Sequence, residues 1–176
     1  MVRIDCDRRE GCVNDAFVFC KAVHILSAAV LFGTGLGIAF FCWFGYRGAI
    51  RSGEIGTLCS ILRLTVIADA RLTAPAVVIQ AVSGTILMSM LGWPLMSAWS
   101  LAVWGLFLLV GACWLPVVVI QVRLKRAADQ AGSVEALPAS FHHSFRWWFA
   151  LGIPAFTAIL ILFYFMVAKP FLSSGA

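Results

Sequence analysis

Charged side chains are scarce in this chain and are missing altogether from three long stretches. Asp, Glu, Lys and Arg make up 12% of the 176 residues, hydrophobic residues make up 62%, and the mean hydropathy is +0.97. No charged residue occurs in residues 22–46, 72–122 or 147–168. This composition is far from that of water-soluble domains, so it excludes an ordinary soluble fold and places the chain in a lipid bilayer.

The lengths of these stretches predict four membrane crossings. A membrane helix needs about 20 apolar residues, and Gly92-Trp93-Pro94 breaks the longest stretch into two. The runs are unbroken and of helical length, unlike the short alternating strands of β-barrels. We therefore predict an all-α, four-helix transmembrane bundle that keeps its first apolar block. The expected spans are Phe17–Phe44, Arg63–Leu91, Trp99–Val122 and Trp147–Ala168, within one domain (17–170) between an N-terminal extension (1–16) and a C-terminal tail (171–176).

Several other absences limit the chemistry. The six cysteines contain no CxxC pair and indicate packing residues, with a disulfide between Cys6 and Cys12 as an alternative if that end faces an oxidising compartment. The sequence has no nucleophile triad, phosphate-binding loop, zinc spacing or nucleic-acid patch. Soluble enzyme chemistry of those kinds is not indicated, and whether the chain is an enzyme stays open. The expected partners are the lipid bilayer and a second copy of the chain, and no nucleic acid.

Basic residues in the loops predict an orientation. Seven lie in the first and third loops and five lie at the opposite side, so the positive-inside rule puts both termini outside the cytoplasm. Trp93, Trp99, Trp147 and Trp148 fall near expected span ends and are interpreted as interface anchors. Gln121 is interpreted as interfacial for the same reason. Residues 127–140 are expected to form a solvated, mobile loop.

The second expected span carries the largest set of polar side chains. A polar group in lipid is unfavourable unless it finds a partner, so these residues are functional candidates. Their spacing of four, four, seven and four residues keeps one helical face, with Ala76 in the gap. They are Thr65, Asp69, Thr73, Gln80 and Gly84. We expect this polar stripe to face the bundle interior, either as a seam for protons, ions or a polar substrate group, or as hydrogen bonds that lock the helices together.

Two neighbours of the stripe need their own explanation. Arg71 lies about 200° around the helix from Asp69, so the two cannot form a simple pair on one face. We expect Arg71 to find another partner or to reach the cytoplasmic headgroups. Pro75 removes a backbone hydrogen bond and is expected to kink the helix beside the stripe.

The first span holds the one histidine at membrane depth, His24. An inward imidazole in an apolar four-helix bundle is a setting for b-type haem, and a hydrogen-bonded structural histidine is the alternative. Because the helices alternate in direction, Met88 and Met166 are expected at the level of His24 as possible second ligands, with Lys21 and Lys169 near the haem propionates. His142 and His143 belong to the opposite interface and are interpreted as solvated loop residues.

The segments KAVHILSAAVLFGTGLGIAFF, ADARLTAPAVVIQAVSG, GACWLPVVVIQVRLKR and WWFALGIPAFTAILILFYFMVAKP together resemble a bacterial integral membrane family, domain of unknown function 2269. The likeness covers residues 21–170 and departs from the family pattern at Ala70-Arg71-Leu72. It implies a four-helix protein of the bacterial inner membrane and no established activity.

A shorter likeness involves Lys21 and His24 alone, which are similar to the opening of membrane protoporphyrinogen oxidases and copper-resistance D-type proteins. In the former, the histidine is linked to haem. Three hypotheses follow from these observations. They are a haem b or porphyrin protein with a membrane redox or porphyrinogen-oxidising role, a small transporter or channel subunit with a polar seam, and a non-catalytic membrane scaffold.

Overall fold

The computed structural model describes the backbone of residues 2–168 and the side chains of residues 14–168. The predicted all-α fold is confirmed, because this part of the chain forms helices and no strand. Four of its helical segments are long and apolar enough to cross a membrane, as predicted. The side chains of Cys6 and Cys12, Lys169 and the expected tail lie outside the described residues.

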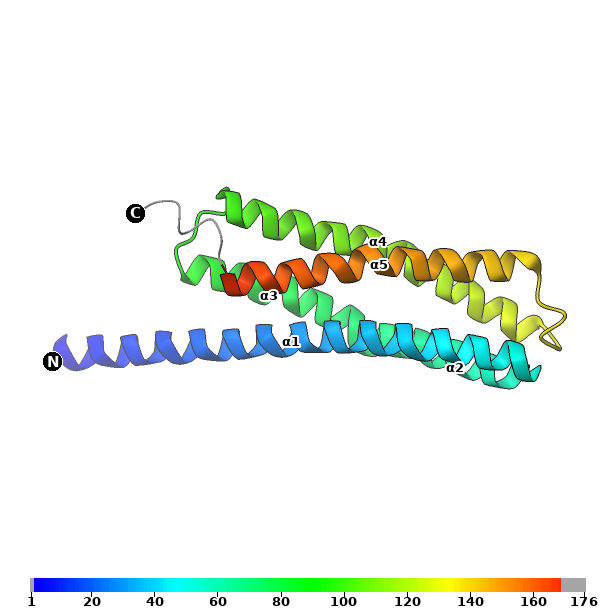
Figure 1. Cartoon of the computed structure of the whole chain (residues 1–176). Helices are drawn as coiled ribbons and strands as arrows, with labels where there is room; N and C mark the ends of the chain where they lie inside the picture. Colours follow the sequence, from blue (N-terminus) through cyan, green and yellow to red (C-terminus); the bar gives the residue numbers. More distant parts are fainter. Residues whose placement is uncertain (1, 169–176) are drawn as a thin grey trace.

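The chain crosses four times, and each crossing runs antiparallel to the one before it (Figure 1). The first, α1, extends over Val2–Ser52, so the residues expected to form an extension continue the helix of the first span. The second crossing is a continuous helical rod with three parts. They are α2 (Ile55–Ala68), the π-helical turn η1 (Asp69–Thr73) and α3 (Ala74–Met90). The last two crossings are α4 (Ala98–Gln130) and α5 (Ala139–Ala168).

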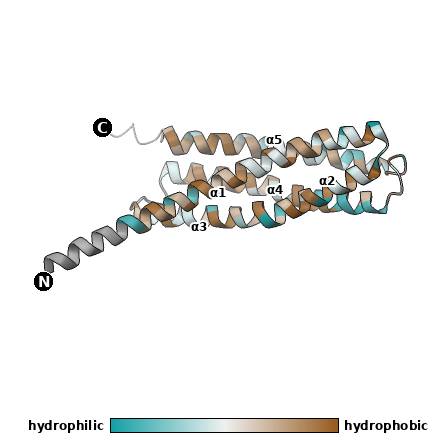
Figure 2. Ribbon diagram, turned by 90° about the horizontal axis from the view of Figure 1, so that it is seen from below, coloured by the Kyte–Doolittle hydropathy of each residue, from teal (hydrophilic) through white to brown (hydrophobic). Residues whose placement is uncertain are grey.

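Each helix extends eight residues beyond its expected span at the end that carries the α1–α2 and α4–α5 connections. Eight residues add about 12 Å of helix. The spans were predicted to end where charged residues begin, but a helix that leaves the bilayer can continue with its charges on the outer face. We call residues 38–69 and 121–148 the loop half, and residues 14–37, 70–120 and 149–168 the far half. Figure 2 shows hydrophilic residues gathering toward the end of the loop half.

The loop half has a packed aromatic and aliphatic core. Tyr46 stacks on Phe145 with ring centroids 4.0 Å apart, and Phe145 also stacks on Trp148. The buried members of this cluster are Cys42, Ala49, Leu58, Leu62, Leu124, Ala128, Val134, Leu137, Phe141, Phe145 and Trp148. Burial of this many large apolar side chains is the main stabilising contribution in a water-facing bundle.

The connection between α4 and α5 differs from its prediction. The helix α4 continues to Gln130, so only residues 131–138 lack helical structure. Val134 and Leu137 of this connection are buried in the core of the loop half, and the backbone N–H of Leu137 donates to the carbonyl of Val134. The expected loop is therefore shorter than predicted, and two of its apolar side chains pack against the bundle instead of being solvated.

The far half is organised as two helix pairs. α3 packs closely along α1, and α4 packs closely along α5; among the described residues no comparably close packing joins α3 to α4 or α5. Buried positions here are mostly small or polar, such as Ser27, Ala76, Ser83 and Ser100. This is the expected pattern within lipid, where association depends on close packing and hydrogen bonds because acyl chains are as apolar as the side chains.

The break between α3 and α4 lies where the sequence predicts it. Gly92 has a φ of 66°, a left-handed conformation that glycine adopts without a steric penalty. Ser97 then caps α4, because its side-chain oxygen accepts a hydrogen bond from the backbone N–H of Ser100 at 3.2 Å.

A π-helical turn stands where a kink beside Pro75 was expected. Proline has no backbone N–H and its ring is too close to the carbonyl four residues earlier for a regular α-turn. The turn Asp69–Thr73, immediately upstream, widens to the π-helical hydrogen-bond pattern. Such single π-turns inside α-helices occur often at functional sites.

Candidate functional site

A series of polar side chains follows the interface of α1 with η1 and α3. It begins near Ser83 and continues to Asp69, a separation of fourteen residues, or about 21 Å of helix. The hydrocarbon core of a bilayer is about 30 Å thick. We call this series, Ser83, His24, Gln80, Ser27, Thr34, Thr73 and Asp69, the polar seam. Its α3 and η1 members share the inward face that the spacing of the second span predicts, and Asp69, Thr73 and Ser83 are buried.

At the far end of the seam, His24 makes a hydrogen bond with each ring nitrogen. The Nε2 atom lies 3.0 Å from the side-chain nitrogen of Gln80, and the Nδ1 atom lies 2.9 Å from the Ser83 hydroxyl. The Gln80 amide nitrogen can only donate, so Nε2 accepts and Nδ1 carries the hydrogen that is donated to Ser83. The Ser83 hydroxyl donates in turn to the carbonyl of Ile79 at 2.6 Å.

The other end of the Gln80 amide is also satisfied, because its Oε1 atom accepts a hydrogen bond from the Ser27 hydroxyl. Ser27 is 6% exposed. Ser27 lies one turn from His24, and Ser83 lies one turn from Gln80, so each pair shares a face. That i, i+3 spacing was the sequence signal for two residues that the prediction missed.

The absence of a side chain at Gly84 allows the His24 ring to approach α3. A Cβ atom built at Gly84 would lie 3.1 Å from Cε1 of His24, closer than most real contacts. Gly84 therefore belongs to the inward face for a steric reason, because it leaves room for the His24 imidazole of the neighbouring helix.

Halfway along the seam, Thr73 donates a hydrogen bond to the Thr34 hydroxyl at 3.3 Å. Thr34 donates to the carbonyl of Val30 in its own helix. Thr65, the remaining member of the expected stripe, is 5% exposed and bonds to the Cys42 thiol in the loop half. The stripe is thus hydrogen bonded to α1 at three levels.

At the boundary of the two halves, Asp69 forms a buried network with α4 and α5. The side-chain nitrogen of Gln121 donates to the Asp69 carboxylate, and the indole Nε1 of Trp148 donates to the Gln121 oxygen at 3.3 Å. Asp69 is 6% exposed and Gln121 is 1% exposed. Asp69 has no ion pair with any residue that the structure describes. The one salt bridge among the described residues joins Lys125 and Asp129 of α4.

The network corrects two predictions. Gln121 is not interfacial but is enclosed between η1 and α5. Trp148 is not an interface anchor, because its ring is 5% exposed within the core of the loop half. Trp99 is likewise buried, with its indole N–H donating to the carbonyl of Phe165, whereas Trp147 is exposed. The helices α4 and α5 each continue eight residues beyond the expected spans, so the end of an apolar run does not mark an exposed position at a helix end.

One buried donor lies in the far half without a partner. Among residues 14–168, Nε1 of Trp114 is the buried side-chain nitrogen or oxygen atom that has no hydrogen bond. Trp114 lies seven residues, two turns, before Gln121 in α4 and therefore near the same helical face. Buried donors of this kind are usually explained by a bound water or ligand.

The residues expected to hold haem do not form a ligand set here. Both nitrogens of His24 have hydrogen-bond partners, Met88 is 8% exposed on α3, and Met166 is 37% exposed on α5. Lys21 is exposed. No group of three His, Cys, Asp or Glu side chains in residues 14–168 could hold a metal ion. Iron could bind His24 only if the imidazole gave up Gln80 or Ser83, so the contacts described here are those of the hydrogen-bonded alternative, and haem ligation stays a prediction.

The interpretation of His142 and His143 as loop residues is wrong, since both lie in the first turns of α5. His142 bonds to the Tyr46 hydroxyl at 2.6 Å, and His143 accepts a hydrogen bond from the Trp147 indole at 2.9 Å. Both contacts lie in the loop half, and neither histidine takes part in the polar seam.

Comparison with known proteins gives one match. The family model described as "Predicted integral membrane protein (DUF2269)" matches residues 18–170, which include all four crossings and the whole polar seam. No curated protein and no solved structure matches the chain.

Proposed function

The chain belongs to the DUF2269 family of predicted integral membrane proteins, and from that premise we propose that it is a transport protein that moves protons along the polar seam, with Asp69 as the carboxyl group that binds and releases them. The main observation behind this proposal is that the carboxylate of Asp69 is buried and that its partner among the described residues is the neutral amide of Gln121. A buried structural carboxylate is normally paired with a cation, because burial of an unpaired charge is unfavourable.

The rest of the seam supports the same function. Hydroxyl, amide and imidazole groups follow one another from Ser83 to Asp69, and each can both donate and accept. The unpartnered Nε1 atom of Trp114, two turns before Gln121 in α4, is a buried donor that a water molecule in the bundle would satisfy. The π-helical turn places Asp69 in a stretch of helix whose hydrogen bonds are already irregular.

The location follows from the resemblance and the loop charges. We propose the cytoplasmic membrane of a bacterium, with the loop half on the cytoplasmic side and both termini outside. In this orientation Asp69 lies near the cytoplasmic end of the seam.

Proton flux into vesicles tests the proposal. The purified chain is reconstituted into liposomes that contain a pH-sensitive dye, and a potassium gradient with valinomycin drives proton entry. We expect the wild-type chain to carry flux, and the Asp69→Asn variant to fall to the level of empty vesicles, because an amide cannot exchange a proton in this pH range. Asp129→Asn is the matched control, since Asp129 is an exposed carboxylate of α4 outside the seam. Its flux should equal that of the wild type.

Folding must be preserved for this comparison. The asparagine side chain in the Asp69→Asn variant retains an oxygen that can accept the hydrogen bond from Gln121, so both variants should have the wild-type circular dichroism and elution volume. Equal flux in Asp69→Asn and the wild type, with both folded, would contradict the proposed function. Haem ligation by His24 stays a prediction, and the absorption spectrum of the same purified protein tests it.

A further inference from the structure

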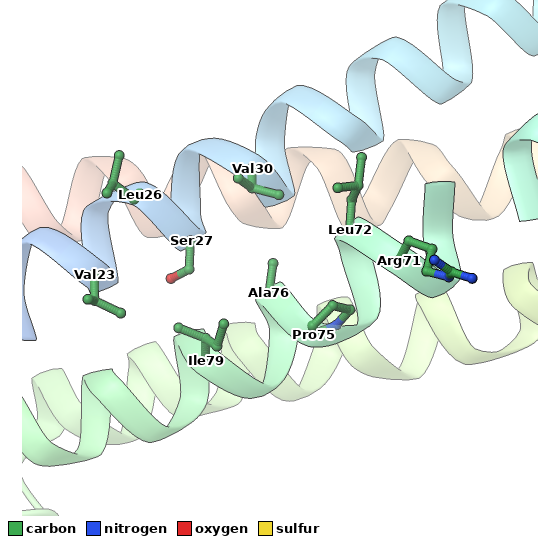
Figure 3. A pocket seen from close by; sticks show the side chains of 9 residues that line it. All are labelled: Val23, Leu26, Ser27, Val30, Arg71, Leu72, Pro75, Ala76 and Ile79. Atoms are coloured by element: carbon green, nitrogen blue, oxygen red, sulfur yellow. The ribbon is translucent and has the colours of Figure 1, made fainter. Parts of the chain in front are cut away.

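An apolar groove lies on the outside of the α1–α3 pair, on the other side of η1 from the Asp69 network. Its volume is about 330 Å³. Two rows of apolar side chains form its walls (Figure 3): Val23, Leu26 and Val30 from α1, and Leu72, Ala76 and Ile79 from η1 and α3. Leu26, Leu72 and Ile79 are exposed, so the groove opens toward the bilayer.

A single cation closes one end of this groove. Figure 3 shows Arg71 at the opposite end from Val23. Its side chain is exposed and has no hydrogen bond or ion pair with any described residue. A guanidinium group at the edge of a membrane is stabilised by an anion, and it binds phosphate with two parallel N–H donors.

The length and depth of the groove match one leaflet of a bilayer. Arg71 borders the charge-free residues 72–122, so it lies where the hydrocarbon begins on the side of the loop half. From Arg71 to Ile79 the helix rises about 12 Å. Half of the hydrocarbon core measures about 15 Å.

Charge complementarity decides between a lipid and a second copy of the chain. The only acidic residue near the level of Arg71 is Asp69, and it is buried in the bundle. Other acidic residues of the sequence lie outside residues 55–128. A second copy would therefore present apolar side chains to the groove but no anion to Arg71.

We propose that this groove is a binding site for an anionic phospholipid of the leaflet on the loop-half side. The phosphate contacts the Arg71 guanidinium, and an acyl chain lies between the two apolar rows. Pro75 also lines the groove, and Arg71 lies within the π-helical turn immediately before it. Ser27 of the polar seam also lines the groove, between the two apolar rows, and the phosphate contact at Arg71 uses no residue of the seam.

Lipid titration of the detergent-purified full chain tests the proposal. Binding of phosphatidylglycerol and phosphatidylcholine is measured by native mass spectrometry. We expect the wild type to bind phosphatidylglycerol roughly fivefold more tightly, the preference that one basic residue gives near a membrane surface. Arg71→Gln should lose this preference, and Arg71→Lys should keep most of it. Arg63→Gln is the matched control, because Arg63 is an exposed arginine of α2 outside the groove, and it should keep the preference.

A second pair of variants tests the apolar part. Ile79→Trp fills the groove and should weaken binding of both lipids, whereas Val78→Trp, at an exposed position outside the groove, should not. The proposal is overturned if folded Arg71→Gln keeps the wild-type preference, or if Arg63→Gln loses as much. It is also overturned if the chain is a dimer that Ile79→Trp dissociates while lipid binding is unchanged, since the occupant would then be a second copy.

Discussion

The two halves of this bundle are held together by different kinds of contact. In the loop half, large aromatic and aliphatic side chains fill a common core between all four helices. In the far half, the helices pack mainly as pairs through serine, alanine and hydrogen-bonded polar groups, and Phe32 of α1 joins the pairs by contacts with Phe156 and Phe163 of α5. The difference matches the surroundings: helices in water are stabilised by burial of apolar surface, and helices in lipid by close approach and hydrogen bonds. We infer that the loop half extends beyond the hydrocarbon into water.

The largest expected effect is the loss of an aromatic side chain from the loop half. Phe145 is 2% exposed and stacks on Tyr46, Trp43 and Trp148. Replacement by alanine should lower the free energy of unfolding by about 3–5 kcal/mol. Phe44→Ala is the control, because Phe44 is 58% exposed and should change stability by about 0.5 kcal/mol or less. Denaturation in detergent measures both; equal losses would contradict the assignment of Phe145 to a buried core from which Phe44 is absent.

A smaller effect is expected at the boundary between the halves. Gln121→Leu removes the partner of the Asp69 carboxylate and of the Trp148 indole, so it should lower stability by about 1–3 kcal/mol. A double-mutant cycle with Asp69→Ala, which removes the acceptor of this hydrogen bond, sharpens the prediction. The two substitutions should be non-additive by about 0.5–3 kcal/mol, because the residues share one hydrogen bond. Strict additivity would show that the contact between Asp69 and Gln121 does not contribute to stability.

The smallest effect is expected in the far half. His24→Ala removes the hydrogen bonds with Gln80 and Ser83, and in a membrane such bonds contribute about 0.6–1.7 kcal/mol. The exposed His143 provides the control variant His143→Ala. The absorption spectrum of the same samples tests the haem hypothesis, which predicts a Soret band that His24→Ala abolishes. Colourless protein from haem-supplied cells would exclude that hypothesis and leave the hydrogen-bonded role.

The sequence was sufficient to predict the number of crossings and the inward face of the second crossing. Charge-free length fixes the number of spans, because a charged side chain is unfavourable in hydrocarbon whatever the fold. The four-residue steps from Thr65 to Thr73 define an inward face for the same reason. Neither argument depends on knowing which helices are neighbours.

What the sequence did not predict depends on packing between helices. Gln121 and Trp148 lie near the ends of apolar runs, where an interfacial position is the simplest interpretation. Their burial follows from the extension of α4 and α5 past the bilayer, and from the position of Asp69 on a third helix. A further signal was present: Gln121, Leu124 and Ala128 follow three- and four-residue steps, the spacing of a buried helix face.

The separate pairing of the helices in the far half has a mechanical consequence. The two sides of the bundle share their largest packed cluster at the loop end, and beyond it Phe32 of α1 contacts Phe156 and Phe163 of α5, so the loop end would serve as the fixed point of a relative motion. A slight tilt of one pair against the other there would be multiplied along the helices into a wider gap at the opposite membrane surface. In such a motion each pair would move as a rigid body.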